Sequence, residues 1–360
     1  MIGPVIKRKT RQVKVGGVKI GGDAPVSVQS MAKAETGDVR SVVPQIRALE
    51  KAGCEIVRVA IKNFRDADAV GQIKRRIKIP LVCDIHFDHR LALRCIASGA
   101  DKIRLNPGNI RDRKEISQVV KAAKKARIPI RVGVNSGSIQ KKPGKGSEGQ
   151  ERDGSAALVR SALEYVKLLE GMDFRDIIIS LKASDVATTV DAYRRIAKIC
   201  DYPLHLGVTA AGPYDSGIVK SAIGIGALLL DGIGDTIRVS LTGDPCDEVV
   251  AARQILAALK IRNFGPEIIS CPTCGRCQVD LGAIVQELER KLSAGQYSLG
   301  AKRPFSIAVM GCEVNGPGEA KETDIGIAFG KGSGLLFKKG KIIKKVAVKK
   351  AVKELLKGIH

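Results

Sequence analysis

Hydrophobic and polar positions follow one repeating order along residues 1–262, in which short apolar runs alternate with amphipathic stretches. Apolar runs rich in β-branched residues are typical of parallel strands buried on both faces, and the stretches between them have the 3.6-residue period of helices. The pattern predicts strands near residues 26–31, 55–60, 81–86, 102–106, 128–134, 177–182, 204–208 and 236–241. Among the predicted helices are residues 39–52, 113–126, 185–199 and 246–260.

Eight strands separated by helices is the number that closes a barrel, so the predicted class is α/β, a (β/α)8 TIM barrel over residues 1–262. A doubly wound open sheet is the alternative. Residues 13–20 alternate around Gly16-Gly17 and predict a hairpin that plugs the barrel floor. Residues 263–360 form the second predicted domain, a smaller α+β unit that ends in a lysine-rich hairpin and helix.

Charged and polar residues interrupt the predicted strands near their carboxyl ends, where TIM barrels place their active sites. Charges inside apolar strands are costly unless they have a partner, so these residues predict a binding site at the barrel mouth, where Asp84 and His86 also lie. Cations with amide and hydroxyl donors suit a phosphate-bearing anion, most simply a diphosphate. The predicted substrate-binding residues are Arg58, Arg104, Asn106, Arg131, Asn135, Lys182, His205, Thr209, Arg238 and Ser240. Residues 141–149, after the fifth strand, are either a lid or a plain loop.

Three cysteines suggest a metal centre in the second domain. Two residues separate Cys271 from Cys274, and Cys312 follows at a distance, with Glu319 seven positions after it. Thiolates select zinc or iron-sulfur clusters, and a second arm with one cysteine and one acid favours a cluster with one exchangeable corner. A zinc site completed by Cys277 and ordinary buried thiols are the alternatives.

The net charge of +24 raises nucleic acid as a partner, but ten lysines between Lys331 and Lys357 account for much of it. Aromatic residues are 3% of the chain, too few for base-stacking platforms, so we expect no nucleic-acid partner. No apolar run has the length of a signal peptide's core or of a membrane span. We therefore expect a cytoplasmic protein with no membrane partner.

Seven motifs along the chain closely resemble the bacterial two-domain 4-hydroxy-3-methylbut-2-enyl diphosphate synthases of the methylerythritol phosphate pathway. They occur in the order of that family and span nearly the whole chain. The motifs are Val28-Gln29-Ser30-Met31, Asp84-Ile85-His86-Phe87, Asn106-Pro107-Gly108-Asn109-Ile110, Lys182-Ala183-Ser184-Asp185, His205-Leu206-Gly207-Val208-Thr209, Cys271-Pro272-Thr273-Cys274 and Asn315-Gly316-Pro317-Gly318-Glu319.

The resemblance implies a 4Fe-4S cluster held by Cys271, Cys274, Cys312 and Glu319, with Glu319 as a labile ligand that serves in catalysis. It also implies reductive ring opening and dehydration of 2-C-methyl-D-erythritol 2,4-cyclodiphosphate, with an acidic ferredoxin or flavodoxin as electron donor. The chain departs from the family at Ala210, where a glutamate is expected, and at Cys277, an extra thiol that we interpret as buried.

Two rival classes fit less well, a zinc-stabilised nucleic-acid-binding protein and an enzyme that cleaves S-adenosylmethionine, whose Cys-x3-Cys-x2-Cys run is missing. Chain geometry adds one expectation. The predicted helix 246–260 returns the chain to the barrel floor, and the linker 261–267 spans at most about 24 Å. We therefore expect a head-to-tail homodimer in which each cluster domain caps the partner's barrel, as the resemblance also implies.

Overall fold

The structure is a computed structural model that describes residues 6–138, 153–294, 305–314, 318 and 323–359. The chain divides into two compact units, Met1–Arg262 and Asn263–His360. Glu319 and the predicted lid at residues 141–149 lie outside the described residues. Within the described part of the chain, no helix is long and apolar enough to cross a membrane.

Eight parallel strands form the first unit, in the order β8-β7-β6-β5-β4-β3-β10-β9. The ring closes through a parallel bridge between Ile179 and Leu204. The predicted TIM barrel is thereby confirmed, and the open doubly wound sheet is wrong. The strands are β3 (Ser27–Met31), β4 (Ile56–Ile61), β5 (Leu81–Ile85), β6 (Lys102–Leu105), β7 (Ile130–Asn135), β8 (Ile177–Lys182), β9 (His205–Leu206) and β10 (Thr236–Ile237).

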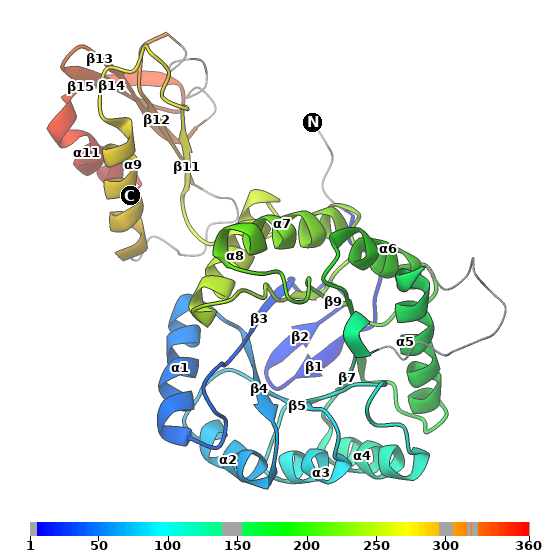
Figure 1. The fold of residues 1–360 in the computed structure, drawn as a ribbon. Coiled ribbons are helices and arrows are strands. Elements are labelled where there is room, and N and C mark those ends of the chain that lie inside the picture. Colours follow the sequence, from blue (N-terminus) through cyan, green and yellow to red (C-terminus); the bar gives the residue numbers. More distant parts are fainter. Residues whose placement is uncertain (1–5, 139–152, 295–304, 315–317, 319–322, 360) are drawn as a thin grey trace. The chain divides into compact units, whose positions relative to one another are not determined.

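Helices surround the barrel in a ring (Figure 1). An Asp or Asn side chain at the N-cap accepts a backbone N–H at the start of every one of them except α7, so the polar residue after each strand also sets where the next helix begins. The helices are α1 (Val39–Ala52), α2 (Phe64–Lys74), α3 (His89–Ala97), α4 (Arg113–Ala126), α5 (Gly154–Glu170), α6 (Val186–Ala197), α7 (Tyr214–Leu230) and α8 (Pro245–Ala258), with a 3-10 turn η1 at Ser136–Ser138.

The last two barrel strands are shorter than predicted. The strand expected at residues 204–208 is His205–Leu206, and the one expected at 236–241 is Thr236–Ile237. Gly207 marks the break, because a Cβ there would lie 2.4 Å from the carbonyl oxygen of Arg238. The backbones approach so closely at this point that regular pairing stops, and Arg238 and Ser240 lie in the loop after β10 rather than on a strand.

The predicted floor hairpin is present as β1 (Val13–Val15) and β2 (Val18–Ile20), paired antiparallel. Its buried side chains pack against the first residues of the barrel strands, in a cluster of Val13, Val15, Ile20, Ile56, Val82 and Ile178. The hairpin therefore closes the amino-terminal end of the barrel with apolar contacts and leaves the carboxyl end open for a ligand.

The second unit contains a five-stranded sheet in the order β11-β12-β13-β14-β15. The first three strands are parallel and the last three form an antiparallel meander. Alternate residues of β12 and β13, such as Ile307 and Ile327, pack with Leu288 and Leu355 of the two helices. The elements are β11 (Glu267–Ser270), α9 (Leu281–Ala294), β12 (Ser306–Met310), β13 (Ile325–Gly330), β14 (Ser333–Lys338), β15 (Lys341–Ala347), the 3-10 turn η3 (Val348–Lys350) and α11 (Ala351–Lys357).

Candidate active site

A buried carboxylate, Asp84 at the end of β5, organises the cations on one side of the barrel mouth. The sheet register pairs Asp84 with Arg104, which donates from Nη1 to Asp84 Oδ1 at 3.1 Å. Arg58 Nε lies 3.9 Å and His86 Nε2 3.3 Å from Asp84 Oδ2. Burial alone would raise the pKa of Asp84, but Arg58, His86 and Arg104 together hold it well below its ordinary value. Asp84 is therefore ionised.

Arg131 is a buried cation of the mouth with two nitrogens that lack a partner among the described residues. It is in register with Arg104 on the neighbouring strand, and its side chain is buried with Nε and Nη1 lacking a hydrogen-bond partner among the described residues. Burial and the charges of Arg58 and Arg104 lower its pKa well below the ordinary value. An unpaired buried guanidinium is costly in a folded protein, so the arrangement indicates an anionic ligand at this point.

Lys182, at the end of β8, lies beside the same group of arginines. It is buried, and burial together with Arg131 and Arg238 lowers the pKa of its ammonium well below the ordinary value. A Cβ at Gly207 would come within 2.8 Å of Lys182 Nζ, so the glycine makes room for the amine. An approaching anion would stabilise the charged form of Lys182.

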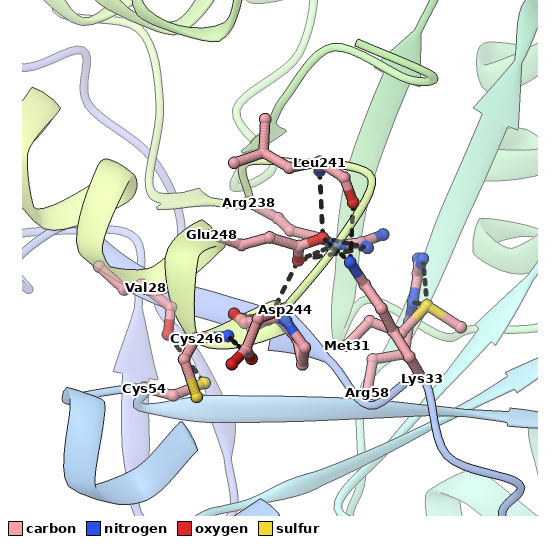
Figure 2. Close-up of polar contacts among 12 residues, drawn as sticks. Val28, Met31, Lys33, Cys54, Arg58, Arg238, Leu241, Asp244, Cys246 and Glu248 are labelled. Atoms are coloured by element: carbon pink, nitrogen blue, oxygen red, sulfur yellow. Dashed lines mark hydrogen bonds and ion pairs between the residues drawn. The ribbon is translucent and has the colours of Figure 1, made fainter. Parts of the chain in front are cut away.

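A second buried carboxylate, Glu248 of α8, organises the part of the mouth beside β3 and β10 (Figure 2). Its Oε2 lies 3.4 Å from Arg238 Nε and accepts the hydroxyl of Ser30 at 3.0 Å. Its Oε1 lies 3.4 Å from Lys33 Nζ and accepts the N–H of Leu241 at 3.1 Å. Figure 2 shows Glu248 extending from its helix toward Arg238 and Lys33.

The remaining predicted binding residues are placed in two groups. Asn106 is buried and accepts the N–H of Gly108, whereas Asn135, Thr209 and Ser240 are partly exposed in or just beyond the strand ends. His205 is fully buried, and neither ring nitrogen has a hydrogen-bond partner among the described residues. Burial and nearby Lys182 lower its pKa well below the ordinary value, so the ring is neutral. In register with Thr236 and two residues before Gly207, His205 lies below the mouth rather than in it.

Three charged residues of the barrel were not predicted from the sequence as functional: Glu248, Lys33 and the fully buried Lys102. Glu248 stands in the first turn of α8 beside Asp247, where an acid ordinarily complements the helix dipole and gives no sign of a binding role. Lys102 has Gln29 Oε1 at 3.4 Å, and burial lowers its pKa well below the ordinary value. A lysine at the start of an apolar strand was the sequence feature that could have identified Lys102.

The cysteine loops of the second unit meet at Gly311, at the carboxyl ends of β11 and β12. The Gly311 N–H donates to Cys271 Sγ at 3.2 Å, and a Cβ on Gly311 would lie 2.4 Å from Cys277 Sγ. Cys274 is exposed, and the Arg276 backbone N–H and side-chain charge lower its pKa. Partly exposed thiols with N–H donors and a thiolate-favouring environment fit a thiolate-bound metal centre. Among the described residues, however, no three acidic, His or Cys side chains converge on one metal position.

Cys277 has other partners. Its thiol donates to the Val279 carbonyl oxygen at 3.2 Å, and it packs against the apolar cluster around α9 and β12. These contacts support the interpretation of Cys277 as a partly buried structural thiol.

Fold and site together define a TIM-barrel enzyme with a cationic mouth, extended by a small cysteine-bearing domain. Residues 10–253 match the family model of the GcpE TIM-barrel domain, and residues 267–360 match that of the GcpE protein C-terminal domain. The chain belongs to the GcpE family.

Its relatives include the 4-hydroxy-3-methylbut-2-en-1-yl diphosphate synthase (flavodoxin) of Fusobacterium nucleatum, 53% identical, with 98% of each chain covered. The protein of the same name from Clostridium perfringens is 53% identical and covers 98% of this chain and 99% of its own. Among solved structures, a dihydropteroate synthase from Stenotrophomonas maltophilia matches 69% of this chain and 98% of its own with a TM-score of 0.51 and 15% identity. That likeness shows the barrel fold alone.

Proposed function

We propose that the chain is a cytoplasmic flavodoxin-dependent 4-hydroxy-3-methylbut-2-en-1-yl diphosphate synthase. The substrate would be 2-C-methyl-D-erythritol 2,4-cyclodiphosphate. One ring carbon–oxygen bond breaks, the hydroxyl leaves as water after taking up a proton, and two electrons from the reduced donor complete the allylic product. The buried Arg131, whose Nε and Nη1 lack a hydrogen-bond partner among the described residues, carries the proposal, together with the names of the relatives.

Residues 1–262 would bind the substrate. Arg58, Arg104 and Arg131 would hold one phosphate, and Lys182 and Arg238 the other, with Asn106, Asn135, Thr209 and Ser240 as neutral donors. When the ring opens, negative charge develops on the leaving phosphate oxygen, and preorganised cations in a water-poor site stabilise that charge. Asp84 would fix the direction of the Arg104 guanidinium before the substrate arrives.

Residues 263–360 would hold a 4Fe-4S cluster through Cys271, Cys274 and Cys312, with Glu319 as the labile fourth ligand. When bound, such a cluster supplies the single electrons that no side chain can donate. The chain's own residues would orient the thiols, because the Gly311 N–H donates to Cys271 Sγ and Gly311 leaves room for the thiols around it.

The direct test is turnover by anaerobically purified, iron- and sulfide-loaded protein. With reduced flavodoxin, the cyclic diphosphate should disappear and the allylic diphosphate should form in equal amount, measured by mass spectrometry. Loaded protein that leaves the cyclic diphosphate unchanged would refute the proposed function.

We further propose that the lysine-rich hairpin and helix, residues 331–357, dock the acidic flavodoxin. Strand β15 is exposed at the edge of the sheet, and Ile342 and Ile343 are 65% and 55% exposed between lysines. A basic rim around an apolar patch suits an acidic protein partner, because opposite charges raise the rate of encounter.

Charge reversal at Lys341 and Lys345 is expected to slow reduction by flavodoxin about tenfold at low salt and to flatten its salt dependence, because the charges act over about 8 Å at physiological ionic strength. Stopped-flow reduction of the loaded protein measures both effects. Reversal of Lys121 and Lys125 on α4 is the matched control and should change neither. Equal salt sensitivity with a small uncharged reductant would leave the lysines without a docking role.

The chain would act as a head-to-tail homodimer. Arg262, the last residue of the barrel unit, donates to the Val26 carbonyl oxygen at 3.1 Å and pairs with Glu55 at 2.6 Å. Both partners precede strands β3 and β4, so the barrel unit ends at its floor, opposite the mouth. This end point supports the proposal that a second chain would supply the cluster domain at the mouth.

A further inference from the structure

Glu248 is an unusual residue to find in an anion-binding mouth. Its side chain is 1% exposed, and a carboxylate so near a phosphate site would repel the ligand. Every contact it makes in the described residues is to a donor: Arg238, Lys33, Ser30 and the Leu241 N–H. A buried charge with this many donors is fully paired, so its burial is compatible with a stable fold.

The donors to Glu248 come from two segments at opposite ends of the barrel sequence. Arg238 and Leu241 belong to the loop after β10, and they flank Ser240. Ser30 and Lys33 belong to β3 and the turn after it, and Lys33 Nζ also donates to the Leu241 carbonyl oxygen at 2.7 Å and to that of Gly243 at 2.5 Å. Strands β3 and β10 are neighbours in the barrel. Glu248 therefore joins the first and last strands of the barrel at the mouth.

We infer that Glu248 is a positioning residue for the diphosphate site, which sets the direction of the Arg238 guanidinium and the path of the Arg238–Leu241 loop. The inference rests on the proposed function for the identity of the ligand. Lys33 would stabilise the same loop through its hydrogen bonds to the carbonyl oxygens of Leu241 and Gly243. Glu248 would not touch the substrate itself.

The direction in which Glu248→Gln changes the affinity for the cyclic diphosphate distinguishes a positioning role from simple electrostatic repulsion. Glu248→Gln removes a negative charge from an anion site, so electrostatics alone predicts tighter binding of the cyclic diphosphate. Loss of the Arg238 orientation predicts the opposite. Hydrogen bonds to charged groups contribute enough that we expect KM and the calorimetric Kd to rise about tenfold or more, with kcat within about threefold.

A double-mutant cycle with Arg238→Met tests whether Glu248 acts through Arg238. In the Arg238→Met background, Glu248→Gln should add little to the rise in KM and Kd. If the double variant raised KM by the product of the two single-variant fold-changes, the inference would be wrong. It would also be wrong if KM fell or stayed unchanged in Glu248→Gln. Should Glu248→Gln fail to fold, Glu248→Asp keeps the charge, ends one methylene short of Arg238 and decides the cycle in the same way.

Glu55→Gln is the matched control, because Glu55 also accepts a backbone N–H, that of Val28 at 2.8 Å, and pairs with an arginine, but at the barrel floor. It should lower the melting temperature and leave KM unchanged. If the wild-type protein neither binds nor converts the cyclic diphosphate, the proposed function fails. The same cycle, run with inorganic pyrophosphate as the calorimetric probe, then decides the role of Glu248 independently.

Discussion

Cys312→Ser is expected to remove most of the bound iron and abolish turnover, whereas Cys277→Ser is expected to keep both near wild type. A serine hydroxyl is a poor replacement for a thiolate ligand to iron. Cys277 instead donates to the Val279 carbonyl oxygen and packs against the apolar core of the second domain, so its loss should cost some stability only. Iron and sulfide analysis, visible absorption and the turnover assay measure the three outcomes.

Glu319→Gln belongs beside these variants because a labile ligand should matter more for turnover than for assembly. It should retain much of its iron and lose most of its activity. The assignment of ligands would be wrong if Glu319→Gln lost iron as completely as Cys312→Ser while Cys277→Ser inactivated the protein.

Mixing two inactive variants is expected to restore activity. Arg238→Ala disables the barrel site and Cys274→Ser disables the cluster domain, so each homodimer should be inactive. In a head-to-tail heterodimer one barrel and one cluster domain are both intact, and statistical mixing should recover about a quarter of wild-type activity per chain. Co-expression with two different affinity tags isolates the heterodimer, in which one of the two sites is intact, so the purified heterodimer should have about half of wild-type activity per chain.

We expect the heterodimer to be active because the barrel unit ends at Arg262, which is anchored beside Val26 and Glu55 at the floor of the barrel. Cys274→Ser mixed with Cys312→Ser is the control, since both variants lack a working cluster domain and should stay inactive. Heterodimers of the first pair that form but remain inactive, or an active monomer, would contradict the arrangement in trans.

The barrel could be predicted from sequence because its signal is local. Buried parallel strands are continuous apolar runs, and Asp or Asn caps mark where the helices begin. The ends of β9 and β10 could not be placed, because they depend on the approach of Gly207 to Arg238, two residues far apart in sequence. A close contact between distant backbones leaves no trace in the pattern of either segment.

The cations of the mouth were equally visible, since each interrupts an apolar strand. The carboxylate that directs Arg238 was not, because Glu248 lies on a surrounding helix, in a turn where acids are common for another reason. Asp84 was noticed at the end of its strand, but its pairing with Arg58 and Arg104 needed the register of three strands. Sequence thus identified the groups that would touch a ligand better than the groups that hold them in place.

The unpaired guanidinium of Arg131 has a consequence for how the protein can change over time. Like charges gathered at the carboxyl end of the barrel oppose folding, while the apolar hairpin seals the amino end and favours it. Substitutions that neutralise the mouth would therefore make the fold more robust and the catalyst worse, a trade-off between stability and activity. The stability that the charged mouth costs would then come from the apolar floor, whose hairpin packs against the first residues of the strands.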